Sequence, residues 1–516
     1  MPKIVKQFTK FVFPFKFDPE KIAPELATIK NKKGAEFKVF ERFSQKTESL
    51  REGLDMMLRE DGGSAKIADC YKLNINCRRY FSLPARKEEP LDFTARQAGA
   101  SALGVAITEL KLYFFESKIG FAEIECEYTS DEIEDYLELN YFICEAKSDK
   151  NRFVCHEKIW NEETKTKDIV DTDFTVEDLL DKLLSYASMC EGAVEFSYRK
   201  DKPMIYSHLL VDEKPNDIND LLQHLTKNYK ESYRFDDSCT KIKSLHPFEN
   251  SYWTGSLNGA TNISFLTGDD LTDNFFKENF NVKARNTYYF LFLNVLHQRH
   301  AVTDIMGRMG HLDRLVNDFY VMDKQLRQAR KYEAEAINLK FRAFFKCPST
   351  IEHVNDYYDM LQGAFQVGAF YDNFKADISS LQSICSKYVE RINERDKKIK
   401  ARKSAKTEIF VSIFAAIVAE VTLFNNSWAL VEKVVGHSIS FWNPGVLILC
   451  ATLVSPLVTV FVNVNKQRGE IKRLTKSINE EQAEQLVEDD KQRRTRARFL
   501  AKVKKSHKKQ NRGKKA

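Results

Sequence analysis

Two apolar stretches near the C-terminal end decide the fold that the sequence predicts. Residues 409–424 read IFVSIFAAIVAEVTLF, with Glu420 as the only charged residue, and residues 445–464 read GVLILCATLVSPLVTVFVNV, with no charged residue. Each stretch approaches the roughly 20 apolar residues that a helix needs to cross a bilayer. We therefore expect two transmembrane helices. The alternative is a pair of helices buried in a soluble core.

The charges beside these stretches favour the membrane interpretation. Residues 395–406 carry seven Lys and Arg residues just before the first stretch, and Lys466 and Arg468 follow the second. The link 425–444 holds one Lys and one Glu. Because positive residues stay on the cytoplasmic side, we expect the link outside the cell. Both chain ends would then be cytoplasmic, and the protein would lie in the cell (inner) membrane.

Glu420 lies inside the first stretch, where a carboxylate is unfavourable unless it faces water or a partner. Small and polar residues recur beside it at helical spacing. They are Ala415, Ala419, Thr422, Asn425 and Asn426. With Glu420 they form a candidate pore lining. The alternatives for Glu420 are a hydrogen bond between helices and snorkelling towards the outer interface.

A helical stalk is expected to precede the membrane segments. Helical patterns begin near Arg285, and a second helix covers 312–345 before Pro348 reverses the chain. The third helix shows a coiled-coil seam of five residues at alternating steps of three and four. The seam consists of Ile378, Leu381, Cys385, Tyr388 and Ile392. Residues 350–424 would form one helix of about 110 Å, at about 1.5 Å per residue, covered by other subunits or by an intrachain hairpin.

Residues 1–280 alternate between strand-like and helix-like patches, which predicts an α+β body in the cytosol. The expected strands are Glu36–Phe43, Cys70–Cys77, Glu109–Phe115, Gly120–Tyr128, Arg152–Trp160, Val194–Tyr198 and Met204–Val211. A hairpin turn is expected at Lys118–Gly120, between two of these strands. The expected helices are Thr129–Glu145, Thr175–Tyr186 and Asp217–Lys227. The predicted domains are 1–280 (body), 281–406 (stalk), 407–464 (transmembrane hairpin) and 465–516 (tail).

Signatures of catalysis, metals and cofactors are not found in the sequence. Gly255–Gly259 lacks the Lys-Ser/Thr end of a phosphate loop, and neither G-x-S-x-G nor H-E-x-x-H occurs. Cys155-His156 and the pair His297 and His300 have no further ligands at metal-site spacing. We therefore expect no enzyme, no metal site and no cofactor. The ligand-binding residues cannot be named from the sequence.

The chain ends in a strongly basic segment. Thirteen Lys and Arg residues and no acidic residue lie in Lys491–Ala516, although the net charge of the whole chain is only +6. Beside a membrane, such a segment meets anionic lipid first. We expect lipid or solvent rather than nucleic acid as its partner, because no base-reading motif accompanies it.

The order of these elements resembles the CorA-type magnesium channel family over residues 285–473. In that family five subunits form a funnel, and a Gly-Met-Asn motif at the outer end of the first span selects hydrated cations. The corresponding residues here are Leu423–Ser427, which keep only Asn. The sequence looks more like the divergent branch that accompanies type III CRISPR systems. That resemblance implies a nucleotide-like second messenger as ligand and a role in antiviral defence.

The sequence therefore predicts a homo-oligomeric, CorA-like ion channel that is gated by a ligand on its cytosolic domain. The resemblance implies a pentamer. The alternative is a membrane-anchored scaffold or enzyme whose transmembrane hairpin serves only as a tether.

Overall fold

The computed structural model describes most of the chain up to residue 435. The described residues are 2–30, 34–44, 47, 49–95, 103–145, 151–161, 166–196, 202–230, 232–233, 243–309, 319–435, 462, 465–466 and 469. The chain divides into two compact units. Unit 1 comprises Met1–Gly310 and Lys331–Asp377, and unit 2 comprises His311–Arg330 and Ile378–Ala516.

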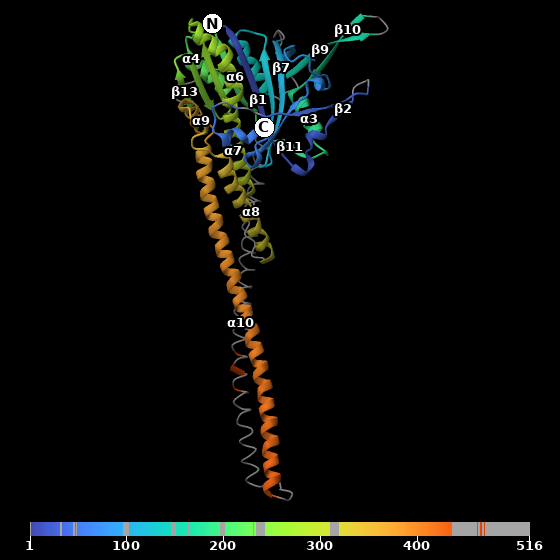
Figure 1. Cartoon of the computed structure of the whole chain (residues 1–516), viewed down its shortest axis with the longest axis vertical. Coiled ribbons are helices and arrows are strands. Elements are labelled where there is room, and N and C mark those ends of the chain that lie inside the picture. The colour runs from blue at the N-terminus through green and yellow to red at the C-terminus, as the bar shows by residue number, and fades with distance from the viewer. Residues whose placement is uncertain are drawn as a thin grey trace, which may run out of the picture. The chain divides into compact units, whose positions relative to one another are not determined.

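Unit 1 is built on one mixed sheet, of which thirteen strands lie within the described residues. The main path runs β10-β9-β6-β7-β8-β1-β12-β15-β14-β13, while β4, β5 and β11 pair beside it. The one parallel pair among the described strands is β12 with β15. Figure 1 shows β9 and β10 extending away from the rest of this sheet.

The strands of this sheet are β1 (Ile4–Phe17), β4 (Phe40–Arg42), β5 (Ala68–Leu73), β6 (Leu91–Ala95), β7 (Leu103–Phe115), β8 (Ile119–Tyr128), β9 (Asn151–Asn161), β10 (Thr166–Phe174), β11 (Val194–Phe196), β12 (Met204–Val211), β13 (Lys243–Phe248), β14 (Ser251–Ser256) and β15 (Gly259–Phe265). A separate two-stranded sheet pairs β2 (Thr28–Lys30) with β3 (Glu36–Lys38). All seven strands predicted from the sequence overlap these elements. The predicted strand Cys70–Cys77 ends early, because a 3₁₀ helix begins at Ile75.

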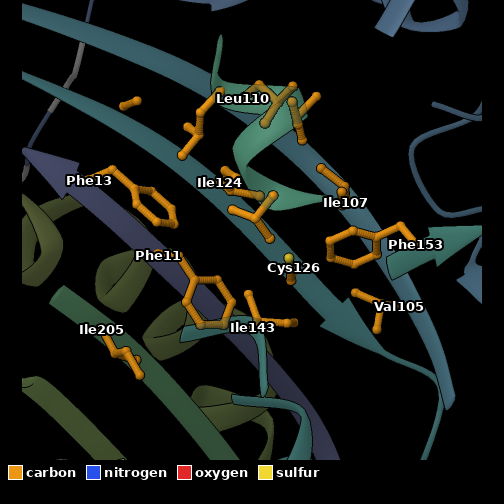
Figure 2. Packing of buried hydrophobic residues seen from close by; sticks show 14 of the residues in the cluster. Phe11, Phe13, Val105, Ile107, Leu110, Ile124, Cys126, Ile143, Phe153 and Ile205 are labelled. Carbon is orange, nitrogen blue, oxygen red and sulfur yellow. The ribbon is translucent and has the colours of Figure 1, made fainter. Parts of the chain in front are cut away.

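One face of the sheet, the apolar face, is lined by aliphatic and aromatic side chains. It packs against α2 (Ile133–Cys144), α3 (Val176–Ala187) and α4 (Ile218–Lys227). Figure 2 shows side chains of this cluster, among them Phe11, Phe13, Ile107, Leu110, Ile124, Cys126, Ile143, Phe153 and Ile205. Successive residues of a strand point to opposite faces, so every second residue of β1 enters this core.

The opposite face, the polar face, carries charged and hydroxyl side chains and is nevertheless buried. It is covered by α7 (Tyr289–Met309) and α9 (Glu352–Ala364). The ring of Trp253 on β14 lies 4.5 Å from that of Tyr357 on α9, and the hydroxyl of Tyr206 on β12 donates to the carbonyl of Ala284 at 2.6 Å. The body is therefore a mixed α/β fold, with helices on both faces of the sheet.

The remaining helices are α1 (Glu52–Asp55), α5 (Asp270–Asn274), α6 (Asn281–Lys283), α8 (Phe319–Ala343) and α10 (Val367–Val435). The long helix predicted for 350–424 is therefore split into α9 and α10. Gln366 lies between them with φ +56°, a left-handed conformation that a continuous helix excludes. After this break, α10 continues for 69 residues.

The predicted membrane topology is not supported. Among the described residues, no helix is both long enough and apolar enough to cross a membrane. This finding contradicts the predicted fold class with its two transmembrane helices, and the interpretation as a membrane channel that depends on them. The physical reason lies in the sequence of 409–424. This stretch is shorter than about 20 residues, contains Glu420, and continues in α10 through Asn425 and Asn426.

Three other predictions stay untested. The second expected span, 445–464, lies outside the described residues except for Val462. The basic segment Lys491–Ala516 lies entirely outside them, so its predicted contact with anionic lipid stays a prediction. The location in the cell membrane stays a prediction as well.

Candidate functional site

The candidate pore residues all belong to α10. Ala415, Ala419 and Thr422 are exposed, and the hydroxyl of Thr422 donates to the carbonyl of Val418 at 2.7 Å. This bond within the helix satisfies Thr422 without a partner from another helix. The side chains of Glu420, Asn425 and Asn426 lie outside the described part of the chain. No observation shows that the six residues line a pore.

A buried cluster of charges occupies the centre of the polar face. The ammonium of Lys10 on β1 lies 2.8 Å from Glu123 and 2.9 Å from Glu125, both on β8. Arg285 pairs with Glu125 from the helical layer above the sheet. Burial alone would raise the pKa of Glu125, but Lys10 and Lys111 outweigh it and lower this pKa to about 2.

This cluster is structural. Lys10, Glu123 and Glu125 are at most 3% exposed, and each charge has an opposite charge within 3 Å. The hydroxyl of Tyr113 donates to Glu123 at 2.7 Å, and the Lys10 ammonium lies 4.1 Å from the centre of the Tyr289 ring. Because these groups satisfy one another, they hold β1 and β8 against α7.

Two hollows in unit 1 adjoin the tip of the β7–β8 hairpin, Glu116–Lys118. The first, the outer cleft, has a volume of about 390 Å³ and is bordered by the end of β1, β4, β5 and β7. The second, the inner cavity, has a volume of about 130 Å³ and is bordered by the hairpin tip, α7 and α8. Both are lined by Ile67 and Glu116.

The outer cleft combines aromatic rings with a few polar groups at its rim. Phe114 is buried and meets the partly exposed Phe17 edge to face at 5.1 Å. At the rim, Arg42 donates to the hydroxyl of Tyr71 at 3.2 Å, and this hydroxyl donates to Glu25 at 3.0 Å. Burial is the main reason why the pKa of Tyr71 rises to about 12, so its hydroxyl stays protonated.

Lys66 and Asp69 are two further charged residues at this rim. The ammonium of Lys66 pairs with the carboxylate of Asp69 at 2.7 Å. The Arg42 side chain is 43% exposed and lies over the Tyr71 ring, 5.5 Å from its centre, while its nearest carboxylate oxygen, on Glu60, is 3.8 Å away. Arg42 can therefore turn its guanidinium plane towards an incoming ligand while keeping its place on β4.

The inner cavity contains a hydroxyl–imidazole pair. Ser117 Oγ lies 2.9 Å from Nε2 of His297, and the His297 ring stacks on Phe115 at 4.0 Å. Burial, with a smaller contribution from His300, lowers the pKa of His297 to about 3. An imidazole this acidic is a poor acceptor for the proton of a serine hydroxyl near neutral pH. In addition, Nδ1 of His297 is buried, and no described residue forms a hydrogen bond with it that would orient the ring.

Arg342 connects the hairpin tip to α8. Its guanidinium pairs with Glu116 and donates to the carbonyls of Ser64 and Lys66. Glu116 also lines the outer cleft, so a change in that cleft acts directly on a residue held by α8. The first residues of α8 belong to unit 2 and its last residues to unit 1.

Comparisons with known proteins do not identify the chain. No protein-family model matches it, and no curated protein matches it. The resemblance to the CorA-type family therefore stays a prediction.

Neither the outer cleft nor the inner cavity was predicted from the sequence. The outer cleft joins Phe17, Arg42, Tyr71 and Phe114 from four strands that are distant along the chain. The sequence contained one usable signal, because Lys118–Gly120 was expected to turn a hairpin. That turn exists, with Lys118 at φ +67°.

Proposed function

We propose that the protein is a non-enzymatic ligand sensor that works as a homo-oligomer. This proposal is based on the outer cleft. Its volume of about 390 Å³ lies within the roughly 300–1,000 Å³ of small-molecule sites. It joins an apolar interior to a few converging polar groups, which is the usual composition of such sites. The poor basicity of His297 favours binding over catalysis at the neighbouring cavity.

The ligand that we propose for the outer cleft is nucleotide-like. A planar base would stack between the ring of Phe17 and the guanidinium of Arg42. The carboxylates of Glu25 and Asp69 would accept hydrogen bonds from amino or hydroxyl groups, and Lys66 would meet phosphate. This composition favours a nucleotide over a purely apolar ligand, for which so many charged groups at the rim would be unfavourable.

The ligand signal would leave the cleft through Glu116. A ligand that draws Glu116 away from Arg342 removes an ion pair between the hairpin tip and α8. Because α8 is a continuous helix of 25 residues, a change at its C-terminal end is passed along its length. Ligand binding shifts the equilibrium only as far as the two states differ in ligand affinity.

We place the contact between subunits on α10, at the coiled-coil seam. Cys385, Tyr388 and Ile392 are only partly covered in the single chain. Further along the helix, Phe410 and Phe414 are 74% and 63% exposed. A second copy of α10 would cover such side chains. The mass of the purified full-length particle tests this assignment, and a monomer that persists at high protein concentration would contradict it.

The ligand site is tested by calorimetric titration of the full chain with adenosine, guanosine and cyclic dinucleotides. We expect one class to bind, and Arg42→Ala to weaken it by about 1–3 kcal/mol, the range for loss of a stacking partner. The matched control is Lys72→Ala, because Lys72 is a surface cation on β5 that pairs with Glu41 and does not line the cleft. Equal affinity in Arg42→Ala and wild type would remove the ligand from this cleft.

A further inference from the structure

The inner cavity differs in chemistry from the outer cleft. Three cationic side chains line it, those of Lys118, Arg308 and Arg342, against the two carboxylates of Glu116 and Glu335. The cations come from three elements, namely the hairpin tip, α7 and α8. The cavity wall therefore has an excess of positive charge where these elements meet.

Lys118 supplies this excess. No ion pair of Lys118 is found among the described residues, although the side chain lines the cavity. Its backbone is fixed by the turn, because its N–H donates to the carbonyl of Phe115 at 2.9 Å and its carbonyl accepts from Phe17 at 3.2 Å. The ammonium is thus carried on a rigid support. It helps to lower the pKa of the nearby Asp18 carboxylate, but the two groups form no ion pair within the described structure.

Each arginine is paired with one carboxylate that is partly or largely exposed. Arg308 lies 2.8 Å from Glu335, which is 33% exposed, and Arg342 pairs with Glu116, which is 56% exposed. Arg308 has a second partner, Asp304, at 2.8 Å, and this carboxylate is only 11% exposed. Ion pairs at such exposed positions contribute little to stability, so a carboxylate turns into water at small cost. A planar guanidinium then offers two parallel N–H groups to an incoming oxyanion.

We propose that the inner cavity binds a tetrahedral oxyanion, either inorganic phosphate or the phosphate group of a larger ligand, through Lys118, Arg308 and Arg342. The volume of about 130 Å³ corresponds to roughly four waters at about 30 Å³ each, which accommodates the five heavy atoms of phosphate. Ser117 and Asn338 also line the cavity and supply neutral hydrogen-bonding groups. A bound oxyanion ties the hairpin tip to α7 and α8.

This site goes beyond the proposed nucleotide cleft, and free phosphate binds there whether or not the cleft accepts a nucleotide. The full chain is titrated with inorganic phosphate, with sodium chloride at matched ionic strength as the blank, and followed by calorimetry and by the midpoint of thermal unfolding. We expect saturable binding and a higher midpoint. Lys118→Ala should weaken binding about tenfold or more, the effect of losing one charged hydrogen bond.

Two further variants distinguish the sources of phosphate and guard against general effects of charge. Lys72→Ala removes a surface cation outside both hollows, and it should bind phosphate like wild type. Arg42→Ala should also leave free phosphate unaffected while it weakens a nucleotide in the outer cleft. If only nucleotides bind and Lys118→Ala weakens them, the oxyanion in the cavity is the ligand's own phosphate. Equal affinity of Lys118→Ala and wild type for both probes would overturn the proposal.

Discussion

Lys10 and Phe11 are neighbours on β1 and are both almost fully buried, but they enter opposite faces of the sheet. Phe11 enters the apolar face, where packing is non-directional and many aliphatic partners would serve. Lys10 enters the polar face, where it requires the carboxylates of Glu123 and Glu125 at hydrogen-bonding distance. The apolar face therefore supplies general stability, while the polar face depends on particular partners from distant strands.

The largest expected effect comes from replacing these two neighbours. Lys10→Met keeps most of the side-chain volume but removes the cation shared by Glu123 and Glu125, so that, among the described cations, Glu123 keeps only the more distant Lys111 at 3.5 Å. We expect it to lower the free energy of unfolding by about 3–5 kcal/mol. Phe11→Ala creates a cavity and should have a similar effect, about 3–5 kcal/mol. Urea unfolding of both variants, followed by tryptophan fluorescence, provides the measurement.

Double-mutant cycles separate the loss of an ion pair on the polar face from the loss of packing on the apolar face. Adding Glu123→Gln to Lys10→Met removes one stranded charge, so the double variant should be more stable than the sum of the single effects by about 0.5–3 kcal/mol. Added to Phe11→Ala, the same substitution should be nearly additive, because Phe11 faces away from Glu123. Additivity in both cycles would contradict the division into two faces.

The difference between the faces also explains which parts of the fold could be predicted. The strand Met204–Val211, which is a mostly apolar run and is buried along nearly its whole length, was located to the residue. The strand Ile4–Phe17 was missed, because Lys6, Lys10 and Lys16 fall where an apolar pattern is expected. Burial of Lys10 depends on Glu123 and Glu125, more than a hundred positions away along the chain, and no local pattern reveals such a partner.

The same limit applies to the long helix and to the candidate site. The prediction that 409–424 end one long helix was right from Val367 onwards, but the apolar composition of this stretch also predicted a membrane span and gave no sign that the helix runs on to Val435. The turn at Gln366 also carried no signal, since neither Pro nor Gly occupies that position. Arg42 and Phe17 meet only through the pairing of strands in the sheet, so the outer cleft required the structure.

Lowering the pH should destabilise the folded protein through the titratable groups of the polar face. The pKa of Glu125 is held at about 2 in the folded protein, against about 4.3 in an unfolded chain. The stabilisation it provides is thus fully present above pH of about 4.3 and is lost as the pH falls towards 2. Burial also lowers the pKa of His208 to about 4, so protonation of the unfolded chain below pH of about 6.5 begins the loss earlier.

Urea midpoints measured from pH 7 down to acid should therefore fall in two stages. Phe11→Ala should follow wild type at a lower level throughout, because it changes no titrating group. Glu125→Gln should be less stable at neutral pH but lose less below pH of about 4.3. If Glu125→Gln and wild type lose stability in parallel, the ion pairs of the polar face do not control the acid response.

The smallest expected effect on stability comes from the N-terminal cap of α3, a helix on the apolar face. The start of this helix could be predicted from its local sequence. Thr175 Oγ1 accepts from the N–H of Asp178 at 3.1 Å, and the Asp178 carboxylate accepts from the N–H of Thr175 at 2.9 Å, forming a capping box at the start of α3. Thr175→Ala should lower the free energy of unfolding by about 1 kcal/mol, and Thr175→Ser should retain most of it. Because Thr175 is also 9% exposed, its methyl group lies near the core. A loss in Thr175→Ser as large as that in Thr175→Ala would show that packing of this methyl group, rather than the cap, fixes the helix start.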